Sequence, residues 1–166
     1  MPVLPKTSNT VAALGLLARD ANAARSDPVK TEAALLEALR LAPNEFDIRL
    51  AAYRFYFYNH RYDAALSHCE ALLAHAARRL NVAGDWRLVG PTDAAFSEAE
   101  FAPGLYLQAL IAWGYCQLRL GEEDAARAAL GHVALLDPTD RFGAGFVVQL
   151  LKARDAEDVE DDEDLV

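Results

Sequence analysis

Residues 107–140 read LQALIAWGYCQLRLGEEDAARAALGHVALLDPTD, and this stretch decides the fold. Its apolar residues recur every three or four positions on both sides of Gly121, which predicts two helices, at about 105–120 and 123–136. Gly121 can take the left-handed conformation that ends a helix, and Pro138 prevents the second helix from continuing. Gly114 and Ala126 are small enough to let the helices pack closely. The stretch therefore predicts two antiparallel helices joined by a tight turn.

The same stretch resembles the tetratricopeptide-repeat (TPR) family, whose unit of about 34 residues folds as a helix pair. The resemblance rests on Trp113-Gly114 in the first helix, Gly121 at the turn, Ala126 and Leu130 in the second helix, and the closing Pro138. It implies three repeats, at about 12–45, 46–79 and 107–140, interrupted by a 27-residue insertion at about 80–106.

The first two repeats match the TPR pattern at fewer positions. Ala65 and Cys69 take the places of Ala126 and Leu130 in the second repeat, and Pro43 closes the first. In the second repeat Tyr53 replaces the small residue of the first helix, His60 replaces the turn glycine and Ala77 replaces the closing proline. The last change predicts a long helix that runs on to Leu80.

Local signals place the remaining elements. The first helix is expected to run to about Ala24, and Asp27-Pro28 suit the N-cap and first position of the second. Further helices are expected at about 45–58 and 62–80, a short one at 92–100 within the insertion, and a capping helix at about 141–154. The expected fold class is therefore all-α: a TPR-like array of about three repeats, forming one domain over 1–154 with an acidic disordered tail at 155–166.

The net charge of −9 comes mainly from the tail, where residues 155–166 hold eight acids and no base. The remaining body is close to neutral, and no basic stripe would offset phosphate repulsion, so nucleic acid is not an expected partner. No signal peptide or membrane span is expected. The two isolated cysteines, Cys69 and Cys116, form no disulfide framework, which favours a cytoplasmic location.

The resemblance also implies a concave face, lined by the first helix of each repeat, that binds another protein. The positions that it places there are Asp20 in the first repeat, Leu50, Arg54, Phe57 and Tyr58 in the second, and Gln108, Ile111, Tyr115 and Arg119 in the third. Aromatic residues and arginine are common anchors of protein interfaces. For the aromatic run at 54–62 two interpretations stay open: burial in the core, or contact of Arg54, Phe57 and Tyr58 with a partner.

The insertion leaves two possibilities as well. Its apolar residues argue against disorder, so it either folds back onto the array or presents Trp86 and Arg87 to a partner. The acidic tail is either a solubilising end, a ligand for a basic partner, or a competitor for its own groove near Arg54 and Arg119.

The sequence offers no catalytic constellation, and no cofactor or metal is expected. His68 and His75 are seven positions apart on one helix, whereas a spacing of three or four would bring two ligands together.

Three functions remain in view. The first is a non-catalytic binding module, an accessory, assembly or stabilising factor that docks on a larger protein complex. Residues 48–66 and Trp113-Gly114-Tyr115-Cys116 look like small TPR-like proteins associated with nitrogen-fixation systems, which implies nitrogenase or its assembly machinery as partner. The second is a chaperone resembling class II of type III secretion, and the third is a small helical enzyme. The oligomeric state is not predicted.

Overall fold

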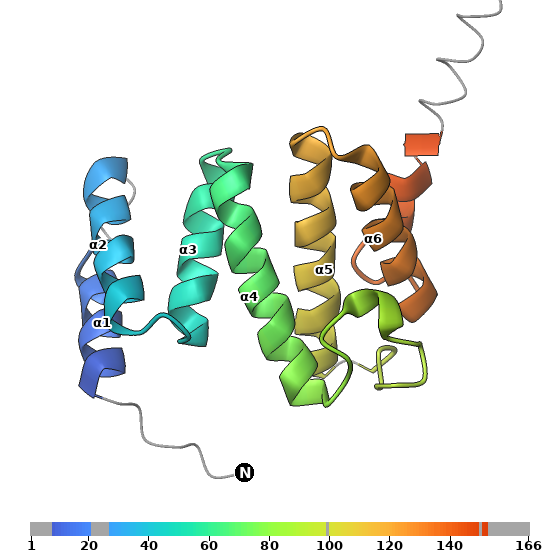
Figure 1. Ribbon diagram of the computed structural model, residues 1–166, viewed down its shortest axis with the longest axis horizontal. Helices are drawn as coiled ribbons and strands as arrows, with labels where there is room; N and C mark the ends of the chain where they lie inside the picture. Colours follow the sequence, from blue (N-terminus) through green and yellow to red (C-terminus); the bar gives the residue numbers. More distant parts are fainter. Residues whose placement is uncertain (1–7, 21–26, 99, 150, 153–166) are drawn as a thin grey trace, which may run out of the picture. The chain divides into compact units, whose positions relative to one another are not determined.

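The structure, a computed structural model, describes residues 8–20, 27–98, 100–149 and 151–152, with the side chains of 16–20 outside the description. Within these ranges the chain forms the α-helices α1 to α6, one short 3-10 helix and a further helical segment near the C-terminal end of the description, and no strand (Figure 1). The predicted all-α fold is confirmed. The helices follow one another as pairs, α1 with α2 and α5 with α6, in the order that a helical-repeat array requires.

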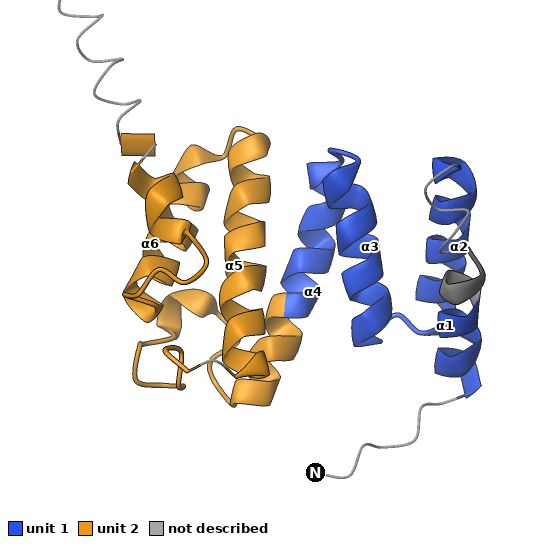
Figure 2. Ribbon diagram, turned by 180° about the vertical axis from the view of Figure 1, so that it is seen from behind, with its two compact units in different colours: residues 1–72 blue, residues 73–166 orange. Residues whose placement is uncertain are grey.

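The chain divides into two compact units, Met1–Leu72 and Leu73–Val166, and the boundary falls inside helix α4, Tyr62–Leu80 (Figure 2). Each unit is described by itself. The prediction of one domain over 1–154 stays a prediction, and the acidic tail at 155–166 lies outside the described residues.

Unit 1 holds α1, Ser8–Asp20, α2, Pro28–Leu41, α3, Phe46–Tyr58, and the first part of α4. The predicted start of α2 is confirmed, because the Asp27 side chain accepts a hydrogen bond from the Lys30 backbone N–H at 3.2 Å and Pro28 follows it. A small core joins the first three helices. Its buried members are Ala13, Ala38, Ala42 and Ile48, with Leu14, Leu39 and Leu41 packed against them.

Unit 2 holds the rest of α4, the 3-10 helix η1, Trp86–Leu88, and the pair α5, Phe101–Arg119, and α6, Glu123–Leu136. The close packing predicted at Gly114 is present. A Cβ atom at this position would lie 3.1 Å from Leu130 Cγ and 3.3 Å from Ala129 Cβ. Gly121 has φ 87°, and α6 ends one residue before Asp137-Pro138, as the turn and stop signals predicted.

Helix α5 begins earlier than expected. It starts at Phe101, so Pro103 and Gly104, interpreted from sequence as breakers, lie in its first turn. Proline is tolerated there because the first N–H groups of a helix have no intrahelical partner. The short helix expected at 92–100 is absent: residues 91–98 form turns apart from Ala95, which has no regular structure. The last helical residues run over 144–149 and 151–152, after a turn at 141–143 instead of from 141.

Candidate functional site

One side of α3 carries the residues that the sequence assigned to a binding face in unit 1. Arg54 lies four residues from Leu50 and from Tyr58 and three from Phe57, so these four residues, called here the α3 surface, share a helix side. Tyr58 is 76% exposed and Arg54 is exposed, while Leu50 and Phe57 are half-buried. The surface thus combines an exposed aromatic ring and an exposed cation with two half-buried apolar side chains.

Neighbouring rings hold this surface in place. The Phe57 ring lies 5.3 Å from that of Tyr53, 5.7 Å from Tyr58 and 5.7 Å from Tyr62, in tilted or edge-on arrangements that aromatic pairs favour. Tyr56 and Tyr62 are buried. The core interpretation therefore holds for Tyr56 and Tyr62, whereas Tyr58 faces solvent. Contact of Arg54, Phe57 and Tyr58 with a partner stays a prediction.

Arg54 differs from the other basic side chains described in unit 1. Lys30, Arg40 and Arg61 make ion pairs, and Arg49 donates to the Pro43 carbonyl at 2.6 Å. Within the described part of the chain Arg54 has no hydrogen bond, ion pair or ring contact. A guanidinium with all its donors open is suited to a carboxylate of another molecule.

A polar network that the sequence did not reveal lies behind the α3 surface. Arg61 Nη1 donates to both carboxylate oxygens of Glu32 at 2.7 Å, and the Tyr56 hydroxyl donates to Glu32 Oε1 at 3.2 Å. The Arg61 guanidinium also lies 4.8 Å above the Tyr56 ring. The hydrogen bond from Arg61 lowers the pKa of Glu32, which stays ionised. These contacts tie α2 to α3 and to the turn that follows α3.

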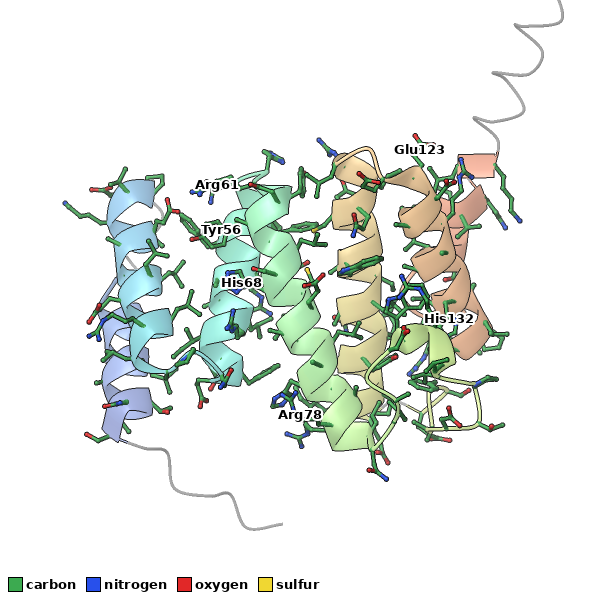
Figure 3. All side chains as sticks on the ribbon, in the orientation of Figure 1. Tyr56, Arg61, His68, Arg78, Glu123 and His132 are labelled. Atoms are coloured by element: carbon green, nitrogen blue, oxygen red, sulfur yellow. The ribbon has the colours of Figure 1, made fainter. Side chains whose placement is uncertain are left out.

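His68 on α4 extends this network (Figure 3). Its ring stacks on that of Tyr56, with centroids 5.5 Å apart, and its Nδ1 lies 3.3 Å from Arg49 Nη1. A guanidinium can only donate, so Nδ1 accepts and the proton sits on Nε2. Burial, followed by the charge of Arg49, lowers the pKa of His68 to about 4. His68 is therefore neutral at pH 7 and packs as a polar core residue.

The predicted positions in unit 2 share one side of α5. Gln108 and Arg119 are exposed, while Ile111 and Tyr115 are half-buried. Arg119 Nη1 donates to the Tyr115 hydroxyl at 3.2 Å, so these two side chains form one polar end of the helix side. Asp20 is the last residue of α1, and its side chain lies outside the described part. The nine predicted positions thus belong to three helices in two units.

The insertion folds back onto unit 2. Trp86 is 7% exposed, with its ring 5.9 Å from Trp113 on α5 and 5.3 Å from His132 on α6. Arg87, an exposed side chain paired with Asp85, places its guanidinium 4.4 Å above the outer face of Trp86. The first of the two possibilities for this segment is the one that the structure shows, and Trp86 is a core residue rather than an exposed anchor.

Main-chain carbonyls hold the insertion at two further points. His132 Nε2 lies 2.8 Å from the Val89 carbonyl, and the Arg141 guanidinium donates to the carbonyls of Phe96 and Glu98, the latter at 2.9 Å. Arg141 is oriented by Asp137, whose carboxylate it approaches to 3.5 Å. Sequence reasoning missed all three contacts, because any residue supplies a carbonyl and the partners lie far apart in the chain.

None of the described helices combines the length and the apolar character that crossing a membrane requires.

Comparison with known proteins identifies one relative. It is described as an uncharacterized 19.8 kDa protein in the nifW 5′ region of Azotobacter chroococcum mcd 1. The two sequences are 37% identical over 129 residues, which cover 76% of this chain and 72% of the relative. No protein-family model and no solved structure matches the chain.

Proposed function

Because this chain belongs to the same family as that Azotobacter chroococcum protein, we propose that it is a non-catalytic protein-binding module of nitrogen fixation. In this proposal it is an accessory or assembly factor that docks on nitrogenase or on its assembly machinery. The position of the relative beside nifW supports the process, and the surface of α3 supports the mode of action.

The observation that carries the proposal is the pairing of Tyr58 and Arg54 on one helix side. Tyr58 is 76% exposed, and Arg54 has no partner within the described residues. A tyrosine ring buries a large apolar area at a small cost in conformational entropy, and arginine adds directional hydrogen bonds. A rigid base of packed rings, Tyr53, Phe57 and Tyr62, means that little ordering is needed on binding.

The helix-pair architecture supports a TPR-like scaffold for this role. Gly114 lies against Leu130 and Ala129, Gly121 is left-handed, and α6 stops before Pro138. In the TPR family these positions hold the small residue of the first helix, the residue at the turn and the residue that closes the repeat. Such arrays bind extended or helical segments of other proteins on one helix side.

The test is direct binding of the full chain to purified nitrogenase component proteins, beside affinity capture from nitrogen-fixing and ammonium-grown cells. One variant, Arg54→Ala/Tyr58→Ala, removes the α3 surface, and a second, Tyr115→Ala/Arg119→Ala, removes the polar end of α5. Truncating interface anchors costs about 1–4 kcal/mol each, so the variant that loses the contact should bind at least about tenfold more weakly.

Asp124→Ala/Leu135→Ala is the matched control, because it truncates one exposed charged and one exposed apolar side chain of α6. All variants are first compared by circular dichroism. Equal binding by all of them would exclude both helix surfaces as the docking site. Failure of the wild type to bind nitrogenase, together with identical capture from both cultures, would remove the link to nitrogen fixation.

A further inference from the structure

A second exposed surface lies on α2, on the side opposite its buried residues Leu35 and Ala38. Val29 is 78% exposed and Leu36 is 54% exposed, with the exposed Ala33 between them. At 100° per residue these three side chains fall within about 60° of one another, so they form one apolar stripe along the helix. This stripe is separate from the α3 surface and has no role in the proposed function.

Two opposite charges lie along one edge of this stripe. Lys30 and Glu37 are seven residues apart, which is nearly two helical turns, and so lie on the same edge. Among the residues that the structure describes, each makes only an exposed pair with a near neighbour in sequence, Lys30 with Asp27 at 3.2 Å and Glu37 with Arg40 at 2.7 Å. Such surface pairs contribute little to stability and can be shared or exchanged.

The pattern of this surface is self-complementary. The midpoint between Val29 and Leu36 and the midpoint between Lys30 and Glu37 both fall beside Ala33. A two-fold axis through that point would set Val29 against Leu36 of a second copy and Lys30 against Glu37 of that copy. In antiparallel helix pairs the same edges of the two helices meet, so both charge pairs would form at once. The small Ala33 would lie at the crossing, where two helices need close approach.

We propose that the α2 surface, Val29, Lys30, Ala33, Leu36 and Glu37, is an isologous interface with a second copy of this chain. The two α2 helices pack antiparallel and cross near Ala33. A single helix pair buries less area than a permanent dimer requires, so the association depends on protein concentration. Its salt dependence follows from the two exposed charge pairs.

Charge reversal at the two edge positions tests the proposal by sedimentation velocity over a wide range of concentrations. Lys30→Glu sets an acid against Glu37 of the second copy, and Glu37→Lys sets a base against Lys30 of that copy. Each single variant should self-associate at least about tenfold more weakly than wild type, because like charges face each other twice. The double variant, Lys30→Glu/Glu37→Lys, restores opposite pairs and should self-associate like wild type.

Mixing the two single variants gives the most specific outcome. One brings two acids and the other two bases to the same edge, so the mixture should form a heterodimer at concentrations where each variant alone stays largely monomeric. Leu36→Glu should abolish association, and Asp124→Lys on α6 should leave it unchanged. Neither single reversal endangers α2, since an acid near its start and a base near its end agree with the helix dipole.

A wild type that stays monomeric at the highest concentration would overturn the proposal. So would a dimer that neither charge reversal weakens, or a mixture of the single variants that does not associate. These results are independent of nitrogenase binding, which is measured on variants of α3 and α5.

Discussion

At the scale of single residues, His68 shows how burial and one neighbour fix a chemical state. It is a buried polar residue that stacks on Tyr56 and accepts a hydrogen bond from Arg49. Burial and the arginine charge both oppose protonation and lower its pKa to about 4, whereas a histidine in the unfolded chain titrates near 6.5. Between these values the unfolded state binds more protons than the folded state. Stability therefore falls as the pH drops through this window.

The chain should thus be less stable at pH 5 than at pH 7, and His68 should account for up to about 2 kcal/mol of the difference. His68→Gln keeps an acceptor for Arg49 but does not titrate, so its free energy of unfolding should change less between the two pH values. Urea unfolding of both proteins at each pH measures the difference. Parallel pH curves for wild type and variant would show that His68 does not become protonated on unfolding.

At the scale of helices, the chain ends three of them, α3, α4 and α5, in the same way. After α3, the N–H of Arg61 donates to the Tyr56 carbonyl at 2.9 Å and that of His60 to the Phe57 carbonyl at 3.1 Å. After α5, Glu122 and Gly121 repeat this pattern with the carbonyls of Gln117 and Leu118 at 2.9 and 3.2 Å. After α4, the N–H of Val82 donates to the Ala77 carbonyl at 3.1 Å and that of Asn81 to the Arg78 carbonyl at 3.3 Å. The left-handed residues His60, Asn81 and Gly121, with φ 58°, 55° and 87°, each close a Schellman motif. His60 thus takes the left-handed conformation at the turn position where the repeat pattern has a glycine.

The contact between α5 and α6 gives the prediction at this scale. Gly114→Ala adds a Cβ atom at 3.1 Å from Leu130 Cγ and 3.3 Å from Ala129 Cβ, so these α6 side chains or the helix itself must shift to accommodate it. Gly131 on α6 is the matched control, since a Cβ atom there meets nothing within 4 Å. Gly131→Ala should stabilise the chain by up to about 1 kcal/mol through helix propensity. Gly114→Ala should be less stable than Gly131→Ala by about 1–3 kcal/mol in thermal or urea unfolding. Equal gains for both variants would show that the helices are not packed closely at Gly114.

The sequence-based predictions succeeded where a feature depends on residues that are close together in the chain. The N-cap at Asp27, the turn at Gly121 and the stop at Pro138 depend on neighbours within one helical turn, and all three are confirmed. The start of α5 was wrong because Pro103 and Gly104 were interpreted as breakers, although a helix tolerates them in its first turn.

Contacts between distant residues could not be predicted from one sequence. Glu32 and Arg61 meet across 29 positions, and Arg141 reaches carbonyls 43 and 45 positions away. The binding role of the α3 surface stays a prediction, but the exposure of Arg54 and Tyr58 agrees with the helix side that the repeat pattern assigned them. The sequence could not decide whether Trp86 is buried or exposed, because tryptophan occurs both in protein cores and at protein interfaces.

At the scale of the whole molecule, one helix belongs to both compact units. Helix α4 runs without interruption from Tyr62 to Leu80, and the boundary between the units falls after Leu72. We expect the two units to unfold together, because neither can unfold its part of α4 without breaking backbone hydrogen bonds next to the other part. The chain also carries its two tryptophans, Trp86 and Trp113, in unit 2 alone. Tryptophan fluorescence therefore reports on unit 2, while far-ultraviolet circular dichroism reports on both.

Ile48→Ala tests this coupling from the other side of the boundary. Ile48 is fully buried in the core of unit 1, so its truncation should cost about 2–5 kcal/mol through lost burial and a cavity. If the units unfold together, the fluorescence midpoint of unit 2 should fall as far as the dichroism midpoint. A fluorescence midpoint that stays at the wild-type value would show that unit 2 unfolds on its own.

The contacts that hold the insertion determine which of its residues can vary among members of this family. His132 and Arg141 reach the carbonyls of Val89, Phe96 and Glu98, and every amino acid offers the same carbonyl. Trp86, Val89 and Phe96 are buried, and the side chains of Asp85 and Asp93 accept hydrogen bonds from the backbone N–H groups of Arg87 and Gly90. The other side chains between 85 and 98 can therefore vary without releasing the segment. Members of this family can therefore carry different exposed side chains in this segment while they share one helical scaffold.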